Sequence, residues 1–375
     1  MEYKFTQNEN YEDFACGRVI YHVGGEPTFP VRLALEMYER CLQYSQKKKD
    51  ISLYDCCSGG AYMLTVLGLI KSDTISKIYG SDINLSSIKL AEDNLGLLTE
   101  TGIQKRRNEL EALYKNYGKA SHLEALQSID RIEKLLSKEI KTSIFIRNAL
   151  EVCDLPFIPD IIITDVPYGN LAEWNEGSGG INQMMEALSE VCSRETIICV
   201  CMDKKQKIQT ELYQRLERQL VGKRKFEIYK KKVFGTLACA KKYAEQDRLG
   251  EWVQLFLHGD GKNIGLANGL KENNFKFLGL KLIGLEDFDV DEGIPEYLTD
   301  NNDKVWFSQV INEMVNAIEN GWDMPPLIVH FHNGVYHPLD GRHRNVALRK
   351  MNISEAMAVI VLNTEEDYQN YIQKH

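Results

Sequence analysis

Short apolar runs alternate with stretches of helical periodicity over residues 51–243. Five of these runs have the length of buried strands, at residues 51–55, 77–82, 143–148, 160–165 and 196–202. Strands that alternate with helices predict an α/β fold with a mostly parallel sheet.

Two further apolar runs, at 226–234 and 236–243, are separated only by a turn that contains Gly235. Because so short a connection cannot join parallel strands, we expect an antiparallel hairpin at the end of the sheet. Five parallel strands followed by a reversed hairpin are typical of class I, Rossmann-like methyltransferases, so the pattern favours a sheet of that class.

Residues 101–141 form a long insert in this pattern. Leucine and isoleucine recur there at helical spacing among many charged residues, which predicts a pair of amphipathic helices. A structural cap on the sheet and a substrate-recognition arm are both compatible with such a helical insertion.

The pattern changes after Tyr243, where four glycines between residues 259 and 269 punctuate a polar stretch. We interpret these glycines as turns at a domain boundary. The prediction is a first domain over 1–245, a linker over 246–270 and a smaller α+β domain over 271–375. In that domain we expect strands at 275–284 and 327–332 and helices at 304–320 and 344–350.

The net charge of the chain is -9 at pH 7, which is unusual for a protein that binds nucleic acid. The acidity belongs to the C-terminal part: residues 1–245 carry 34 Lys and Arg against 34 Asp and Glu, whereas residues 246–375 carry 11 against 20. Positive charge in the first part is clustered at 47–49, 105–107, 204–207, 223–225 and 230–232. Such clusters can contact phosphates, although a solvated surface explains each of them as well.

No apolar run approaches the ~18 residues that span a bilayer, and the N-terminus is polar rather than signal-like. We therefore expect a cytoplasmic protein without a membrane partner, in which the scattered cysteines are reduced thiols. The grouping nearest to zinc-ligand spacing is His330, His332 and His337. It lacks a clear fourth ligand, so we expect no metal.

Three predicted strands end in residues that suit a nucleoside cofactor. The first strand turns through glycines, which let backbone N–H groups approach a ligand, and a carboxylate after the second can accept both ribose hydroxyls. A helix N-cap is the alternative role for that carboxylate, Asp82. The Gly-x-Gly-x-x-Gly fingerprint of dinucleotide sites is absent, so S-adenosylmethionine fits better than NAD. The expected cofactor-binding residues are Asp55, Cys56, Ser58, Gly59, Asp82, Asn148 and Ala149.

The fourth strand runs directly into Asp165-Val166-Pro167-Tyr168-Gly169. This segment resembles the Asp/Asn-Pro-Pro-Tyr tetrapeptide of amino-group methyltransferases, and its expected catalytic residues are Asp165, Pro167 and Tyr168. Asp165 and the carbonyl beside Pro167 can accept the hydrogens of an exocyclic amine, while Tyr168 stacks on a flipped-out base. A turn with Asp165 as its cap is the structural alternative. The segment alone does not distinguish adenine N6, cytosine N4 and guanine N2.

The N-terminal part resembles the AviRa-type ribosomal RNA methyltransferases associated with resistance to avilamycin and related orthosomycins. The matching segments are residues 26–34, 55–59, 64–69, 81–82, 94–95, 121–125 and 164–169. The resemblance implies methylation of guanine N2 in 23S ribosomal RNA, with ribosomal RNA or a ribosomal subunit as partner. It also implies Arg32, Tyr168 and Gly169 as substrate-binding residues. Two departures are Ser58-Gly59-Gly60, where Gly-Ser-Gly is expected, and Leu150, where an acidic residue is expected.

Residues 325–361 resemble the ParB/sulfiredoxin superfamily, chiefly in the box Asp340-Gly341-Arg342-His343-Arg344. In that superfamily the corresponding loop meets a nucleotide phosphate, which suggests ATP or CTP as a second ligand. A retained but inactive scaffold is the alternative.

Two other functions remain open at this point. A DNA adenine-N6 or cytosine-N4 methyltransferase would use the same Asp165 chemistry on a flipped DNA base. A nucleotide-dependent switch or small-molecule kinase would instead act through the C-terminal domain.

Overall fold

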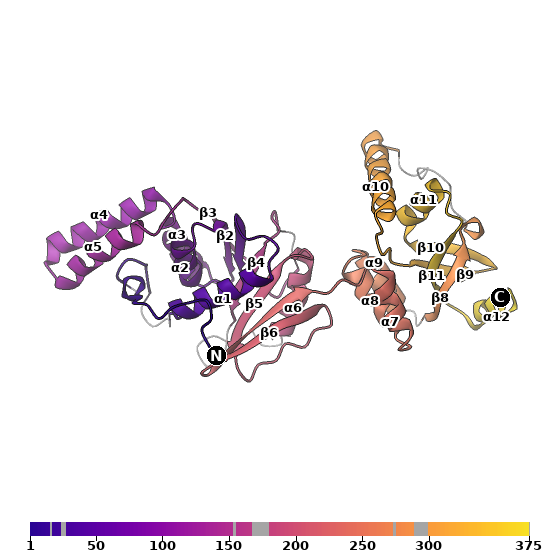
Figure 1. The fold of residues 1–375 in the computed structure, drawn as a ribbon, viewed down its shortest axis with the longest axis horizontal. Helices are drawn as coiled ribbons and strands as arrows, with labels where there is room; N and C mark the ends of the chain where they lie inside the picture. The colour runs from indigo at the N-terminus through magenta and orange to yellow at the C-terminus, as the bar shows by residue number, and fades with distance from the viewer. Residues whose placement is uncertain are drawn as a thin grey trace. The chain divides into compact units, whose positions relative to one another are not determined.

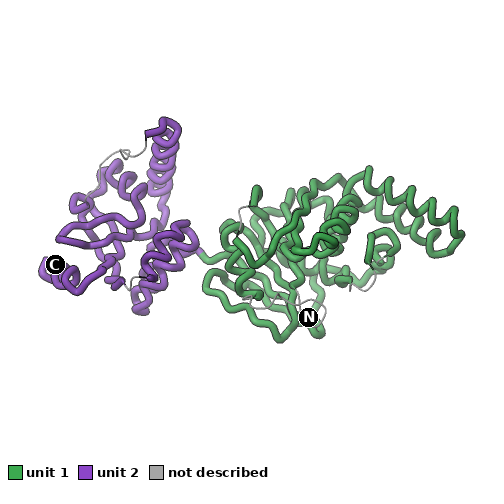
Figure 2. The backbone as a smooth tube through the Cα atoms, turned by 180° about the vertical axis from the view of Figure 1, so that it is seen from behind, with its two compact units in different colours: residues 1–232 green, residues 233–375 purple. Residues whose placement is uncertain are grey.

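The computed structural model describes residues 1–15, 17–23, 28–152, 155–166, 180–272, 275–288 and 299–374. The chain divides into two compact units, residues 1–232 and residues 233–375 (Figure 2).

Unit 1 is built on a seven-stranded sheet with the order β3-β2-β1-β4-β5-β7-β6 (Figure 1). The first five strands pair in parallel, whereas β7 is antiparallel to both β5 and β6. This confirms the predicted parallel sheet with a reversed hairpin. The strands are β1 (Ile51–Asp55), β2 (Ile75–Asp82), β3 (Lys141–Ile146), β4 (Ile161–Asp165), β5 (Ile197–Asp203), β6 (Tyr213–Val221) and β7 (Arg224–Lys231).

The sheet buries a separate core on each face. In β1, for example, Leu53 belongs to one of these cores and its neighbour Tyr54 to the other. Successive side chains of a strand point to opposite faces, so strands that are apolar throughout can serve both cores. Besides the short 3-10 turn η1 (Glu12–Phe14), the helices against the sheet are α1 (Val31–Tyr44), α2 (Tyr62–Ile70), α3 (Leu85–Gly96) and α6 (Gly180–Val191).

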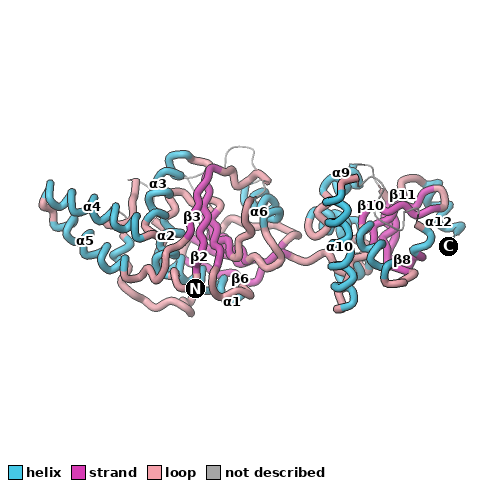
Figure 3. Tube along the Cα trace, turned by 90° about the horizontal axis from the view of Figure 1, so that it is seen from above, coloured by secondary structure: helices cyan, strands magenta, loops and turns pink. Residues whose placement is uncertain are grey.

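The insert between β2 and β3 forms the two predicted helices, α4 (Glu100–Tyr117) and α5 (Ala120–Glu133). They lie side by side as a hairpin that extends away from the sheet (Figures 1 and 3). Thr99 caps the first helix by accepting the N–H of Gly102, and Gly118, with a φ of 60°, ends it. Most of the pair is therefore an exposed surface of unit 1.

One strand of the hairpin at the sheet's end was predicted, since β7 covers most of the run at 226–234, but its partner strand was not. The first strand of the hairpin is β6, whose alternating, highly charged sequence occupies the edge of the sheet and shows little apolar signal. The run at 236–243, predicted as a strand, is instead helix α7 (Leu237–Ala244). Thr236 starts this helix by accepting the N–H of Cys239 at 3.1 Å, a typical N-cap.

Unit 2 contains a four-stranded sheet with the order β10-β9-β11-β8, in which only β9 and β11 are parallel. Its strands are β8 (Lys276–Gly284), β9 (Leu327–His332), β10 (Val335–Asp340) and β11 (Glu355–Leu362). A 3-10 turn, η3 (Leu285–Asp287), follows β8. The remaining helices of the unit are α8 (Leu249–His258), α9 (Ile264–Glu272), α10 (Asn301–Glu319), α11 (Arg342–Lys350) and α12 (Glu365–Lys374).

The predicted boundary near residue 245 and the predicted linker over 246–270 are wrong. The units separate between Lys232 and Val233, and most of the expected linker is the helix pair α8 and α9. Trp252, Phe256 and Leu257 are buried along α8, and the Trp252 indole N–H donates to the carbonyl of Phe234 at 3.0 Å. The amphipathic helix α8 was not predicted because the glycines between residues 259 and 269 suggested a linker, although they lie after α8 and within α9. None of the described helices is long and apolar enough to span a membrane.

Candidate active site

Three carboxylates meet at one edge of the unit 1 sheet. Asp55, Asp82 and Asp165 are the last residues of β1, β2 and β4, which lie side by side in the order β2-β1-β4. The carboxyl ends of parallel strands are the usual ligand position in open α/β sheets. Two predicted cofactor residues, Asp55 and Asp82, thus end strands on the same side of the sheet as the predicted catalytic Asp165.

Asp55 is the most buried of the three, with an exposed fraction of 3%. Burial is the main cause that raises the pKa of its carboxyl to about 7; hydrogen bonds from Thr164 and from the Cys57 N–H oppose the rise, and the charges of Asp165 and Asp82 add to it. One of its oxygens accepts that N–H at 3.0 Å. Asp55 therefore titrates near neutral pH in the ligand-free protein.

The glycine turn after β1 is tied to the end of β2. Asp82 accepts the N–H of Gly59 with one oxygen and the N–H of Asn84 with the other, each at 2.9 Å. The N-cap of α3 is Asn84, so Asp82 does not have the N-cap role that was considered as its alternative. Gly59 has a φ of +51°, and apart from its two chain neighbours no described residue has an atom within 4 Å of where its Cβ would be. The turn thus leaves open space beside a carboxylate, which fits a nucleoside ligand.

The turn after β3 contains the other predicted cofactor residues. Asn148 uses its side-chain oxygen to accept the Leu150 N–H at 3.1 Å and its amide to donate to Glu151 at 2.9 Å, and Ala149 is buried. The sequence analysis missed Arg147, a buried guanidinium that donates to the Tyr54 hydroxyl at 2.8 Å. Its position directly after a strand is the only signal in the sequence, and its burial is explained by the hydroxyl partner, because arginine is rarely buried unless it is paired.

Asp165 lies beside Cys201 in the pairing of β4 with β5. Burial, followed by the charge and hydrogen bonding of Asp165, raises the pKa of the Cys201 thiol well above its usual range, so this cysteine stays a neutral thiol. The backbone N–H of Val166 donates to the Cys201 carbonyl at 3.0 Å and fixes the start of the loop. The other predicted loop residues, Pro167, Tyr168 and Gly169, lie outside the described residues.

Two predicted site residues point elsewhere. The side chain of Cys56 is 1% exposed and packs against Met184 and Thr164 in the core, so only its backbone can meet a ligand. Arg32 donates to the carbonyl of Thr6 at 2.9 Å and stacks on Tyr3, with its Cζ 4.0 Å from the ring centre. In this structure Arg32 therefore anchors the N-terminal segment.

Comparison with known proteins decides the family of unit 1. The sequence profile of the family described as rRNA methyltransferase AviRa matches residues 1–224, more than half of the chain. The chain belongs to this family. A relative from Streptomyces viridochromogenes, named 23S rRNA (guanine(2535)-N(1))-methyltransferase, is 33% identical over 223 residues, covering 56% of this chain and 88% of the relative.

Solved structures agree with this assignment. The rRNA methyltransferase AviRa from S. viridochromogenes, determined at 1.5 Å, has a TM-score of 0.55 at 28% identity and covers 60% of this chain and 94% of its own. A second structure of it, at 2.4 Å, has a TM-score of 0.54 at 29% identity, covering 59% and 93%. The predicted RNA methyltransferase with a class I fold is confirmed. The relative's name differs from the expectation in the atom, because it specifies guanine N1 and the sequence analysis favoured N2.

The basic clusters of the AviRa domain divide into paired and exposed sets. Lys105 pairs with Asp93, Arg107 with Asp130 and Glu133, and Lys47 with Asp160. Members of the 230–232 cluster also pair, with Glu195 and Glu211.

A further set is exposed and forms no ion pair among the described residues, and we call it the edge lysines: Lys204, Lys205, Lys207 and Lys223. The Lys204 N–H donates to the Lys223 carbonyl at 3.1 Å, which joins the two segments just beyond the end of β5. The edge lysines therefore lie at the same sheet edge as Asp165.

In the second unit, the predicted phosphate box is a tight turn into α11. Gly341 has a φ of +105°, a conformation that favours glycine, and a Cβ there would lie 2.6 Å from Leu327. Arg344 is buried, donates to the carbonyls of Pro325 and Pro326, and pairs with Asp340. His343 packs on Phe307, with ring centres 4.7 Å apart. Three of the five predicted residues, Asp340, His343 and Arg344, are thus occupied within the fold.

Proposed function

We propose that this protein methylates N1 of a guanine in 23S ribosomal RNA with S-adenosylmethionine as the methyl donor. The observation that carries the proposal is Asp165 at the carboxyl edge of the sheet, beside the buried Asp55 and the glycine turn. The relative named for guanine N1 supports the base and the atom. Resistance to orthosomycin antibiotics, which the family resemblance implies, would be the biological consequence.

The chemistry requires a group that removes a ring proton. Guanine N1 carries a hydrogen and is a poor nucleophile until that proton leaves. Asp165 would accept the N1 hydrogen and, with its other oxygen, the adjacent N2 amine, because both donors lie on one edge of the base. The same carboxylate therefore suits N1 and N2, and the orientation of the flipped base decides between them.

The cofactor would lie across the ends of β1 and β2. We assign Asp82 to binding the ribose hydroxyls of the cofactor. The backbone around Ser58 and Gly59 would approach the cofactor closely, and the turn at Asn148 and Ala149 would contact its adenine. When bound, S-adenosylmethionine supplies a methyl group activated by its sulfonium. Asp55 would hold the positive end of the cofactor, and its carboxylate is close enough to Asp82 and Asp165 for their charges to shift its pKa.

The edge lysines would contact the phosphates of the ribosomal RNA. They are exposed at the sheet edge that carries Asp165, whereas the other clusters contain lysines and arginines already paired with carboxylates. Phosphate contacts supply most of the affinity of such complexes and orient the target base without reading its sequence.

Methyl transfer to 23S ribosomal RNA with two matched variants tests the proposal. Asp165→Asn keeps the shape of the side chain but cannot take a proton, so we expect a loss of about 100-fold or more in turnover. Asp203→Asn is the control, because Asp203 ends the neighbouring strand and uses its oxygen only to cap the Lys205 N–H at 2.8 Å in the described contacts. Equal activity of both variants, or labelling of duplex DNA alone, would overturn the assignment.

A nucleotide role for the second unit rests on the left-handed turn at Gly341 and the N-terminus of α11. Asp340 and Arg344 pair with each other. The residues proposed to bind the nucleotide are therefore Gly341, Arg342 and the first turn of α11. Binding of ATP or CTP to the full chain that Arg342→Ala abolishes would support it, whereas equal binding by the variant would refute it. A switch or kinase acting alone through this unit is not favoured, because the family assignment accounts for unit 1 as an enzyme.

A further inference from the structure

Two histidines of unit 2 share one face of a sheet. His330 and His332 are two residues apart on β9, so their side chains point the same way. Their rings are nearly parallel, with centres 5.6 Å apart and planes inclined by 18°. Phe331 between them points to the opposite face and joins the hydrophobic core. The strand thus presents a pair of imidazoles beside each other.

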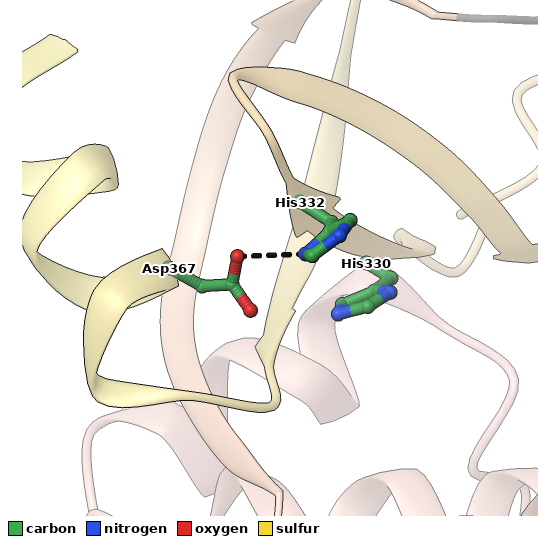
Figure 4. Close-up of side chains that lie close together, drawn as sticks. All are labelled: His330, His332 and Asp367. Atoms are coloured by element: carbon green, nitrogen blue, oxygen red, sulfur yellow. Dashed lines mark hydrogen bonds and ion pairs between the residues drawn. The ribbon is translucent and has the colours of Figure 1, made fainter.

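A buried carboxylate from a distant helix completes this cluster. Asp367, in the first turn of α12, lies 2.9 Å from Nδ1 of His332 through its Oδ1. Only 3% of the Asp367 side chain is exposed, compared with 48% for His332. Figure 4 shows ring nitrogens of both histidines on the side that faces this carboxylate. One donor atom from each residue lies within 4.8 Å of the others.

The carboxylate is held in place by its own helix cap. Thr364 donates its hydroxyl to Oδ2 of Asp367 at 2.8 Å and accepts the Asp367 N–H at 3.0 Å. This reciprocal contact fixes the carboxylate, as hydrogen bonds around metal sites commonly do. Nε2 of His330 is buried without a hydrogen-bond partner among the described residues. A buried ring nitrogen without a partner is costly unless a ligand meets it.

We propose that His330, His332 and Asp367 bind a divalent transition-metal ion, with Zn²⁺ as the expected ion. Two imidazoles and one carboxylate suit zinc, whereas Mg²⁺ and Ca²⁺ prefer oxygen ligands. Ligands at about 2.0–2.1 Å from a tetrahedral zinc lie roughly 3.4 Å apart, so from separations within 4.8 Å the widest pair closes by at most about 1.4 Å. The fourth position is left to water. No metal was expected from the sequence because His330, His332 and His337 lack a clear fourth ligand, and Asp367 lies 35 residues beyond His332.

Metal binding would join β9 to the last helix of the described chain. Among the other contacts of α12, Glu365 pairs with Lys276 at 2.8 Å, the Tyr371 ring packs on Phe331 with centres 5.3 Å apart, and Lys374 donates to the Gly334 carbonyl at 2.8 Å. A metal bridge from the strand to Asp367 adds a link at the start of the helix. Amide hydrogen exchange over residues 364–374 should then slow when zinc binds.

The test is a zinc titration of the metal-stripped full chain against a chromophoric chelator. We expect one tight site per chain, which excess Mg²⁺ does not displace. His330→Ala and Asp367→Asn should each weaken that site by about 100-fold or more, since removing outer contacts alone costs 10–100-fold. His258→Ala is the matched control, a histidine of the same unit on α8. It should bind zinc like the unchanged chain.

Several results would overturn the proposal. They are the absence of a saturable zinc site in the unchanged chain, displacement of zinc by Mg²⁺, and undiminished affinity in His330→Ala and Asp367→Asn. If either variant loses its far-ultraviolet circular dichroism, His332→Ala replaces it, because a half-exposed side chain is removed with little harm to the fold. Hydrogen exchange of the unchanged chain tests the site independently of any variant. Protection of α12 by zinc supports the site, and protection elsewhere or nowhere refutes it.

Discussion

The protonation of Asp55 should control cofactor affinity near neutral pH. Burial raises the pKa of this carboxyl to about 7 in the ligand-free protein. S-adenosylmethionine carries a sulfonium and an ammonium, so the ionised carboxylate binds it better than the neutral acid. If only the ionised form binds, the dissociation constant scales as 1 + 10^(pKa − pH). It should therefore fall by about tenfold between pH 6 and pH 8, which is ~1.4 kcal/mol.

Isothermal titration calorimetry of cofactor binding measures this effect directly. We expect the affinity to rise with pH and about half a proton to leave the protein on binding at pH 7, when buffers of different ionisation enthalpy are compared. Asp55→Asn should abolish the part of the pH dependence that belongs to the protein. The titration of the cofactor's own amino group remains in the variant and is subtracted. An unchanged pH profile in Asp55→Asn would refute the reasoning.

Two further predictions concern the RNA surface and the stability of unit 1. Replacing Lys204 and Lys223 with Glu should weaken ribosomal RNA binding and reduce the slope of log affinity against log salt by about 0.7–0.9 for each phosphate that is no longer neutralised, measured by filter binding. The same double change at Lys47 and Lys105 is the control, because both are already paired, and equal slopes in the two variants would contradict the assignment. Arg40→Ala should lower the free energy of unfolding by about 3–5 kcal/mol in urea denaturation, because it leaves the buried Glu36 without the guanidinium that donates to it at 2.8 Å. A decrease below about 1 kcal/mol would show that the pair contributes little.

The sequence was most informative where the chain is apolar. Three of the five parallel strands, β1, β4 and β5, are buried at nearly every position and are mostly apolar, which makes them visible without a structure. Strand β6 was missed because it lies at the sheet edge, where alternating charged residues face solvent. Helix α8 was missed because the glycines beyond it suggested a linker, although Trp252 and Phe256 lie on one face of it.

Some residues of the candidate site could also be predicted from the sequence, and others could not. Asp55, Asp82 and Asp165 could be predicted because each ends a strand, and the carboxyl ends of neighbouring parallel strands meet. The roles of Cys56 and Arg344 could not, since both are settled by tertiary packing: one side chain turns into the core and the other pairs with Asp340. Asp367 comes close to His330 and His332 only in the folded chain, so its place in this cluster could not be predicted from local sequence spacing.

Nucleoside analysis of treated 23S ribosomal RNA tests the central claim most directly. The RNA is incubated with the enzyme and S-adenosylmethionine, digested, and analysed by mass spectrometry against 1-methylguanosine and N2-methylguanosine standards. The account predicts 1-methylguanosine at a single position, absent when Asp165→Asn replaces the enzyme. N2-methylguanosine, a methylated adenosine or cytidine, or an unmodified RNA would contradict it.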